Sequence, residues 1–191
     1  LYPESQPYFW DLSLLEGAGH NQFPVTLQRA DYLARVMALH SFVAPEPLTI
    51  DDEFNFTKVW MFRASIKKDP MRLANYETPL GDGLVIVCAG LLLLGGVYFF
   101  KNIFKQYDGY SIAFIVTLLF YFVLHLQYGK DAFLYTANWT YAITLFLALA
   151  WRELAGKRWF HALLLVFVFL MLVNNSGLLK TMMEITAPAA Q

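Results

Sequence analysis

The sequence predicts an all-α polytopic membrane protein with four transmembrane helices and an N-terminal extracytoplasmic helical lobe. The 191-residue chain is 58% hydrophobic and only 15% charged, which is too apolar for an ordinary soluble domain of this size. Its second half holds four apolar runs: Leu84–Phe100, Ser111–Leu126, Phe133–Trp151 and Trp159–Val173. Each run has about the roughly 17–25 residues that cross a hydrocarbon core, where helices satisfy the backbone.

Polar residues and charges divide the chain into three predicted regions. Residues 1–83 form a hydrophilic lobe with seven Lys/Arg against eleven Asp/Glu. Residues 84–173 form the four-helix transmembrane region, and residues 174–191 form an extracytoplasmic tail. Membrane lipid is therefore an expected partner, and no basic field indicates binding to nucleic acid.

The first half of the lobe contains one clear amphipathic pattern. From Thr26, apolar residues recur at helical spacing, with Arg29 and Arg35 off their face, and predict a helix ending before Pro45. The residues of this face are Leu27, Ala30, Leu33, Ala34, Met37 and Ala38. The helix could lie on the bilayer or pack on the bundle; packing is favoured because it lacks a Lys/Arg-rich polar face.

A second lobe helix is predicted from about Asp51 to Lys67. The stretch beginning at Thr49 places acidic side chains in a first helical turn, where they favour the helix dipole. Pro70 stops this helix. The Pro and Gly residues of 79–83 indicate a turn directly before the first span.

The loops between the apolar runs predict the topology. The first link contains Lys101 and Lys105, and the third contains Arg152, Lys157 and Arg158. Both links should face the cytoplasm under the positive-inside tendency. The short link from Gln127 to Ala132 then lies on the opposite side, with the lobe and the C-terminus outside the cytoplasm.

Polar residues around the start of the third run form the candidate substrate-binding site. On a helix, Tyr135, Asn138 and Trp139 share one face because they are spaced i, i+3 and i+4. An amide between two aromatic rings could hold a hydroxyl-rich ligand, and Lys130 could pair with a phosphate. Alternatively, Asn138 bonds to another helix, the rings anchor at the interface, and Lys130 pairs with Asp131 or lipid headgroups.

Other chemical motifs are weak. No metal site is predicted: the acidic residues 51–53 read as helix-capping groups, and the histidines lack zinc-ligand spacing. The single cysteine, Cys88, reads as a small buried residue. Asn55 and Asn174 begin glycosylation sequons. A cofactor is not indicated by any motif and stays unknown.

One stretch carries a family resemblance. The residues Gly129-Lys-Asp-Ala-Phe-Leu-Tyr-Thr-Ala-Asn-Trp-Thr-Tyr precede a hydrophobic span, a basic turn and a last span ending Val173-Asn-Asn-Ser-Gly. Together they resemble the C-terminal region of bacterial polytopic membrane proteins related to GT-C-type glycosyltransferases. The resemblance covers about residues 84–186. It implies a bacterial inner-membrane protein that uses a lipid-linked sugar donor at the extracytoplasmic face.

The same family places an essential acidic residue in its first external loop, and no residue of this chain matches that acid. The resemblance therefore implies a C-terminal portion of a longer enzyme, with missing N-terminal spans and an unknown catalytic residue. Glu53, Asp69 and Asp82 are external carboxylates without motif support. The alternative function is a noncatalytic structural or assembly subunit bound to partner membrane subunits, so the sequence leaves enzymatic activity open.

Overall fold

The computed structural model describes residues 25–46, 48–49, 59–60, 75–103, 109–127 and 135–186. These residues are helical except for connecting turns and one two-residue strand pair. The helices are α3 (Leu27–Arg35), the π-helix η2 (Val36–His40), α4 (Pro79–Asn102), α5 (Gly109–Gln127), α6 (Thr136–Ala150), the 3₁₀ turn η4 (Trp151–Leu154) and α7 (Arg158–Thr186).

Three of these helices are long and apolar enough to cross a membrane. They are α4 with 24 residues, Gly109–Leu126 of α5 with 18, and Arg158–Lys180 of α7 with 23. The third predicted run instead forms the 15-residue α6 followed directly by η4. The helical class and the membrane character are thus confirmed for the described residues, with three candidate spans.

The helix α4 begins five residues earlier than predicted. The Thr78 side chain accepts a hydrogen bond from the backbone N–H of Gly81 at 3.1 Å, which satisfies a free donor of the first turn. Pro79 fits the first helical position because its missing N–H needs no partner there. The expected turn at residues 79–83 is therefore wrong, since these residues form the first turn of α4.

The second predicted lobe helix is wrong where the structure describes it. Val59–Trp60 forms strand β2, which pairs antiparallel with β1 (Leu48–Thr49). Valine and tryptophan are both frequent in strands, so the local preference allows this pairing. The rest of that predicted helix, including Asp51 and Lys67, lies outside the described residues.

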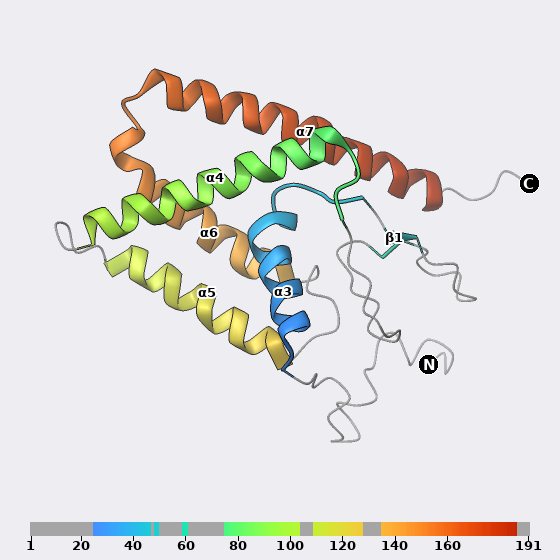
Figure 1. Cartoon of the computed structure of the whole chain (residues 1–191), viewed down its shortest axis with the longest axis horizontal. Helices are drawn as coiled ribbons and strands as arrows, with labels where there is room; N and C mark the ends of the chain where they lie inside the picture. Colours follow the sequence, from blue (N-terminus) through green and yellow to red (C-terminus); the bar gives the residue numbers. More distant parts are fainter. Residues whose placement is uncertain are drawn as a thin grey trace, which may run out of the picture.

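The helices form a bundle crossed at one end by α3 (Figure 1). The helix α4 packs against both α6 and α7, and α5 runs along α6. The segment α3–η2 contacts α4, α5 and α6 near the beginnings of α4 and α6. This end is called the α3 end below.

The first lobe helix packs on the bundle, as favoured from the sequence, but with a different face. The side chains of Tyr32, Leu33, Val36 and Met37 are buried against Trp139, Ile143 and Leu147. Leu27 is 91% exposed, and Ala34 is exposed as well. The predicted face is therefore wrong: the buried face is rotated about the helix axis relative to it and includes the polar residues Arg29 and His40.

Candidate functional site

A buried arginine joins the lobe helix to the bundle at the α3 end. Arg29 is 2% exposed, and its Nη2 donates a hydrogen bond to the His125 carbonyl oxygen at 2.9 Å. His125 lies in the last turn of α5, where carbonyl groups lack helical partners and a positive charge is favourable. The same guanidinium lies 5.3 Å from the centre of the Tyr32 ring. Arg29 therefore caps α5 from another helix.

Aromatic rings surround His125. Its imidazole is 2% exposed and stacks on Tyr121, with ring centres 6.3 Å apart. The Tyr135 ring lies 4.5 Å away, and the Trp139 ring meets the imidazole edge-on at 5.4 Å. These residues and Arg29 are called the Arg29–His125 cluster; it brings α3, α5 and α6 together.

Trp139 connects α6 to the π-helix. Its indole Nε1 donates to the Ser41 hydroxyl at 3.0 Å, and that hydroxyl donates to the Val36 carbonyl at 2.7 Å. The backbone N–H of Ser41 also donates to the Val36 carbonyl, at 3.1 Å. This five-residue spacing is the π-helical pattern, which occurs often at functional sites. Trp139 is 0% exposed and thus anchors the lobe segment.

The structure places three of the four predicted substrate-binding residues. Tyr135 and Asn138 are half-buried, so each keeps surface that a ligand could contact. Trp139 is fully buried, so it offers a ligand no free ring face. Lys130 lies outside the described residues, in the connection 128–134 that joins α5 to Tyr135. The binding role of these residues stays a prediction.

A second set of polar contacts joins α7 to the segment after the π-helix. The Asn175 side chain accepts from the Ala44 backbone N–H and donates to the Phe42 carbonyl, both at 2.9 Å. Asn174 donates to the Ala44 carbonyl at 2.9 Å. These two residues are called the asparagine clamp. The amide nitrogen of Asn174 also donates to the Asn175 side-chain oxygen at 3.3 Å, so a glycan at this sequon would replace one of the two N–H groups that make these contacts.

His40 and Tyr76 complete the polar contacts at this end. Their rings meet edge-on with centres 5.6 Å apart, and the Tyr76 hydroxyl donates to the Val43 carbonyl at 2.9 Å. Burial, with a smaller contribution from Arg35, lowers the pKa of His40 from 6.5 to about 4. Burial also raises the pKa of Tyr76 above its usual value, so its hydroxyl stays protonated.

Sequence reasoning missed most of this arrangement. Arg29 was assigned to the polar face, His40 to no role, and the asparagines to a tail that in fact continues as α7 to Thr186. One available signal was the pair of amides ending an apolar run, since buried amides in a span need partners. The contacts of Arg29 with residue 125 and of Asn175 with residue 44 depend on tertiary packing, which local patterns do not encode.

Of the three external carboxylates named from the sequence, the structure describes one, Asp82. No group of three or more His, Cys, Asp or Glu side chains lies close together among the described residues. Asp82 is exposed in the first turn of α4. Glu53 and Asp69 lie outside the described residues, so their predicted positions are neither supported nor contradicted.

No family model, curated protein or solved structure compared with this chain gives a match. The function is therefore inferred from the residues themselves.

Proposed function

We propose that this chain is part of an integral-membrane, glycosyltransferase-like protein that uses a lipid-linked sugar donor at the extracytoplasmic face. The observation that supports this most directly is the placement of Tyr135 and Asn138. Both are half-buried: Tyr135 belongs to the Arg29–His125 cluster, and Asn138 directly precedes its member Trp139, where a lobe helix meets the start of α6. An aromatic ring and an amide with exposed surface suit the apolar faces and the hydroxyl groups of a sugar.

The combined length of α6 and η4 supports a fourth span in the proposed topology. Although α6 has only 15 residues, the 3₁₀ turn η4 continues it for four more. At about 1.5 Å per α-helical residue and about 2.0 Å per 3₁₀ residue, the two together extend about 30 Å. That length matches the hydrocarbon core. In this topology, α4, α5, α6–η4 and α7 cross the bilayer in alternating directions.

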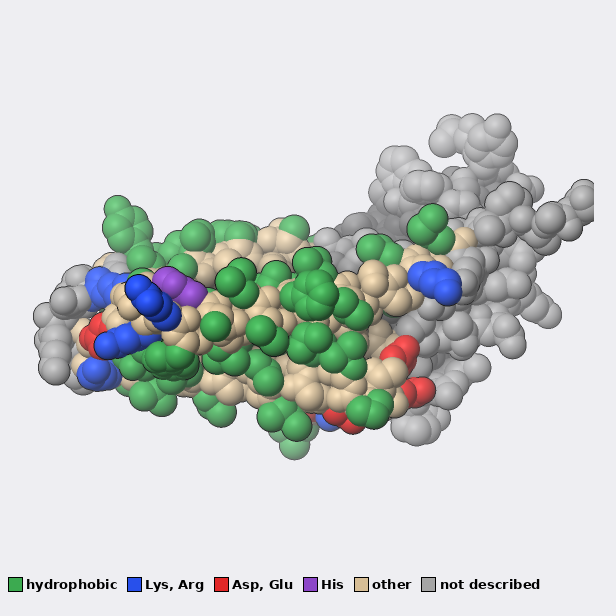
Figure 2. Space-filling view, turned by 90° about the horizontal axis from the view of Figure 1, so that it is seen from above, with side chains coloured by type: hydrophobic (Ala, Val, Ile, Leu, Met, Phe, Trp, Pro, Cys, Tyr) green, Lys and Arg blue, Asp and Glu red, His purple; other side chains and the backbone are tan. Residues whose placement is uncertain are grey.

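Charge distribution supports the proposed orientation. Figure 2 shows Lys and Arg side chains gathered at one end of the bundle, with a largely hydrophobic surface between the ends. This basic end lies where α4 ends and α7 begins, and it holds Lys101, Arg152, Lys157 and Arg158 together with Glu153, which pairs with Lys101 at 2.8 Å. Positive residues favour the cytoplasmic side, so the α3 end lies outside. Tyr135, Asn138 and the connection containing Lys130 then face the compartment where lipid-linked sugars are used.

The test is sugar transfer by the protein in its native membrane, with a labelled lipid-linked sugar and the substitution Asn138→Ala. We expect the product to fall at least about tenfold, which corresponds to about 1.4 kcal/mol of lost transition-state stabilisation. Thr140→Ala is a suitable control, because Thr140 is half-buried on the same helix and its hydroxyl bonds only to the Thr136 carbonyl. Absence of transfer in the wild type would reject the proposal, as would full activity of Asn138→Ala.

The second candidate is a noncatalytic subunit of a larger membrane assembly. It is favoured by the complete burial of Trp139 and by the asparagine clamp, since both serve packing of the lobe against the spans. Under this function, partner membrane proteins copurify with the chain, and Trp139→Ala reduces their recovery. Sugar transfer by the wild-type protein separates the two candidates.

A further inference from the structure

An apolar groove lies between the spans, and its lining includes no residue of the Arg29–His125 cluster. It has a volume of about 190 Å³ and separates α6 from α7, while α4 forms its floor. Its lining includes Cys88 and Leu91 of α4, Leu147 and Trp151 at the α6–η4 boundary, and Leu164 and Phe167 of α7. The groove is thus a gap in the bundle that faces hydrocarbon.

The lining limits what can fill this groove. Water needs two to four polar partners, which such an apolar lining does not provide. A helix is roughly 10 Å wide and is too broad for this volume. A hydrocarbon chain needs no hydrogen bonds and is thin enough to enter, so a lipid chain is the occupant that fits.

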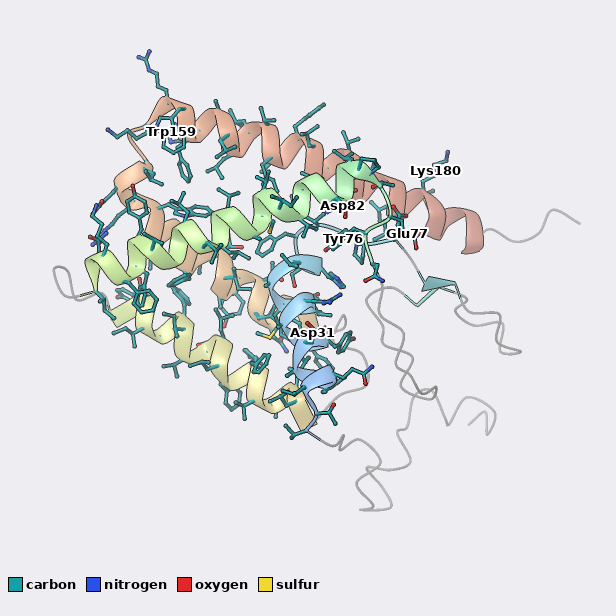
Figure 3. All side chains as sticks on the ribbon, in the orientation of Figure 1. Asp31, Tyr76, Glu77, Asp82, Trp159 and Lys180 are labelled. Carbon is teal, nitrogen blue, oxygen red and sulfur yellow. The ribbon has the colours of Figure 1, made fainter. Side chains whose placement is uncertain are left out.

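The charges at the two ends of the bundle indicate which class of lipid binds. Arg152, Lys157 and Arg158 are exposed at the basic end, in η4 and around the start of α7. Figure 3 shows Trp159 at this same end of α7, and Glu77, Asp82 and Lys180 at the opposite end. Glu153 at the basic end pairs with Lys101 at 2.8 Å. Arg152, Lys157 and Arg158 therefore attract an anionic phosphate to this end, whereas the three labelled charges at the opposite end are of mixed sign.

Distances along α7 agree with a lipid anchored at the basic end. Leu164 and Met171 lie six and thirteen residues beyond Arg158, which is about 9 and about 20 Å at 1.5 Å per residue. Half of a hydrocarbon core is about 15 Å. An acyl chain from a headgroup at Arg158 therefore reaches the groove.

We propose that the groove holds an acyl chain of an anionic phospholipid whose phosphate binds Arg152, Lys157 and Arg158. This site is separate from the proposed sugar-transfer site and does not depend on it. The bound chain fills the space between α6 and α7, so this lipid is a structural component of the bundle.

The experiment uses the full chain in nanodiscs that contain a phospholipid with a photoreactive diazirine in the middle of one acyl chain. Phosphatidylglycerol and phosphatidylcholine carrying the same chain are compared, and labelled peptides are located by mass spectrometry. We expect phosphatidylglycerol to label Cys88, Leu147 and Phe167 peptides several-fold more than phosphatidylcholine does. Equal labelling by the two lipids overturns the proposal, as does labelling confined to the lipid-exposed side chains of Leu93 and Leu165.

Variants separate headgroup binding from groove occupancy. The triple substitution R152Q/K157Q/R158Q changes exposed side chains only and should lower phosphatidylglycerol labelling to the phosphatidylcholine level. Lys180→Gln, at the α3 end, is the matched control and should leave labelling unchanged. Unchanged labelling in the triple variant rejects the headgroup site.

Occupancy of the groove is measured independently by the alkylation rate of Cys88, which lines the groove and is the only cysteine of the chain. Phosphatidylglycerol should slow its alkylation by N-ethylmaleimide several-fold in the wild type and not in the triple variant. An alkylation rate that is the same with both lipids contradicts a chain bound in the groove.

Discussion

At the scale of single residues, buried polar side chains hold the lobe segment to the spans. Arg29 donates to the end of α5, and Trp139 donates to Ser41 beside the π-helix. Both donors lie among apolar groups, where an unpaired polar group costs more than in water. The loss of either partner should therefore loosen the lobe segment, even though neither residue need touch a ligand.

Arg29→Ala should destabilise the protein by about 1.5–3 kcal/mol, because it removes a hydrogen bond from a charged group to a buried carbonyl. Arg35→Ala on the same chain segment is the matched control. Its side chain is exposed and pairs with Asp31 at 3.1 Å, an i,i+4 contact that contributes about 0.5 kcal/mol or less. Thermal unfolding in one detergent compares the two variants, and equal midpoints would contradict the capping role of Arg29.

His40 should make stability depend on pH. Its folded-state pKa of about 4 lies below the unfolded value of 6.5, so the unfolded chain binds more protons between these values. The free energy of unfolding should therefore be at its full value above pH 6.5 and fall by up to about 3 kcal/mol as the pH drops to 4.

The measurement for His40 is denaturant unfolding of wild type and His40→Gln across this pH range. The variant should lose the part of the pH dependence that belongs to His40, so the two curves converge towards pH 4. His161→Gln, at an exposed position near the basic end, is the control and should follow the wild type. Parallel curves for wild type and His40→Gln would contradict the prediction.

At the scale of elements, α4 and α6 approach closely at one glycine. A Cβ atom at Gly95 would overlap the Leu147 side chain and lie 3.5 Å from the Trp151 indole nitrogen. Small residues at helix interfaces allow this approach in membranes. Gly90, five residues earlier on the same helix, is exposed and has open space around its Cβ position.

Gly95→Leu should destabilise the bundle by about 1–3 kcal/mol through overpacking. Gly90→Leu should be neutral or slightly stabilising, because leucine is a better helix former than glycine and points into open space. Both variants are compared by thermal unfolding. A similar midpoint for the two would show that α4 and α6 do not meet at Gly95.

The sequence predicts helices correctly where one strong local property determines them. Hydrophobic length located α4, α5 and α7, since a span must be long and apolar whatever surrounds it. The rotation of α3 was mispredicted because its buried face contains Arg29 and His40. The partner of Arg29 lies 96 residues away in sequence, and His40 meets Tyr76 in another segment of the chain. Similarly, the sequence predicts a polar tail at Asn174 and Asn175, because their partners in segment 42–44 are apparent only from the tertiary structure.

The candidate site was predictable only in part. Spacing correctly placed Tyr135, Asn138 and Trp139 at the start of a helix, because that pattern is local. It could not distinguish the fully buried Trp139 from its half-buried neighbours, since burial there depends on α3 and η2. His125 stands out in the sequence as an ionisable residue at the end of a span, whereas its contact with Arg29 depends on tertiary packing.

At the scale of the whole molecule, the proposed orientation has a direct test. In a background with Cys88→Ser, single cysteines replace Lys157 and Lys180, which lie at opposite ends of the bundle. A membrane-impermeant maleimide applied to intact cells should label the position 180 cysteine, while the position 157 cysteine reacts only after permeabilisation. The reverse pattern would place the α3 end, with Tyr135 and Asn138, in the cytoplasm.

The burial of α3 also constrains how the protein is made. Arg29 is separated from its acceptor at residue 125 by 96 positions, and Ala44 from its asparagine partner by 131. The lobe helix leaves the ribosome before the spans that hold these partners, yet its binding surface does not exist until those spans have been inserted. Its docking is therefore a late event in biogenesis, and α7 supplies the last of these partners to a segment made long before it.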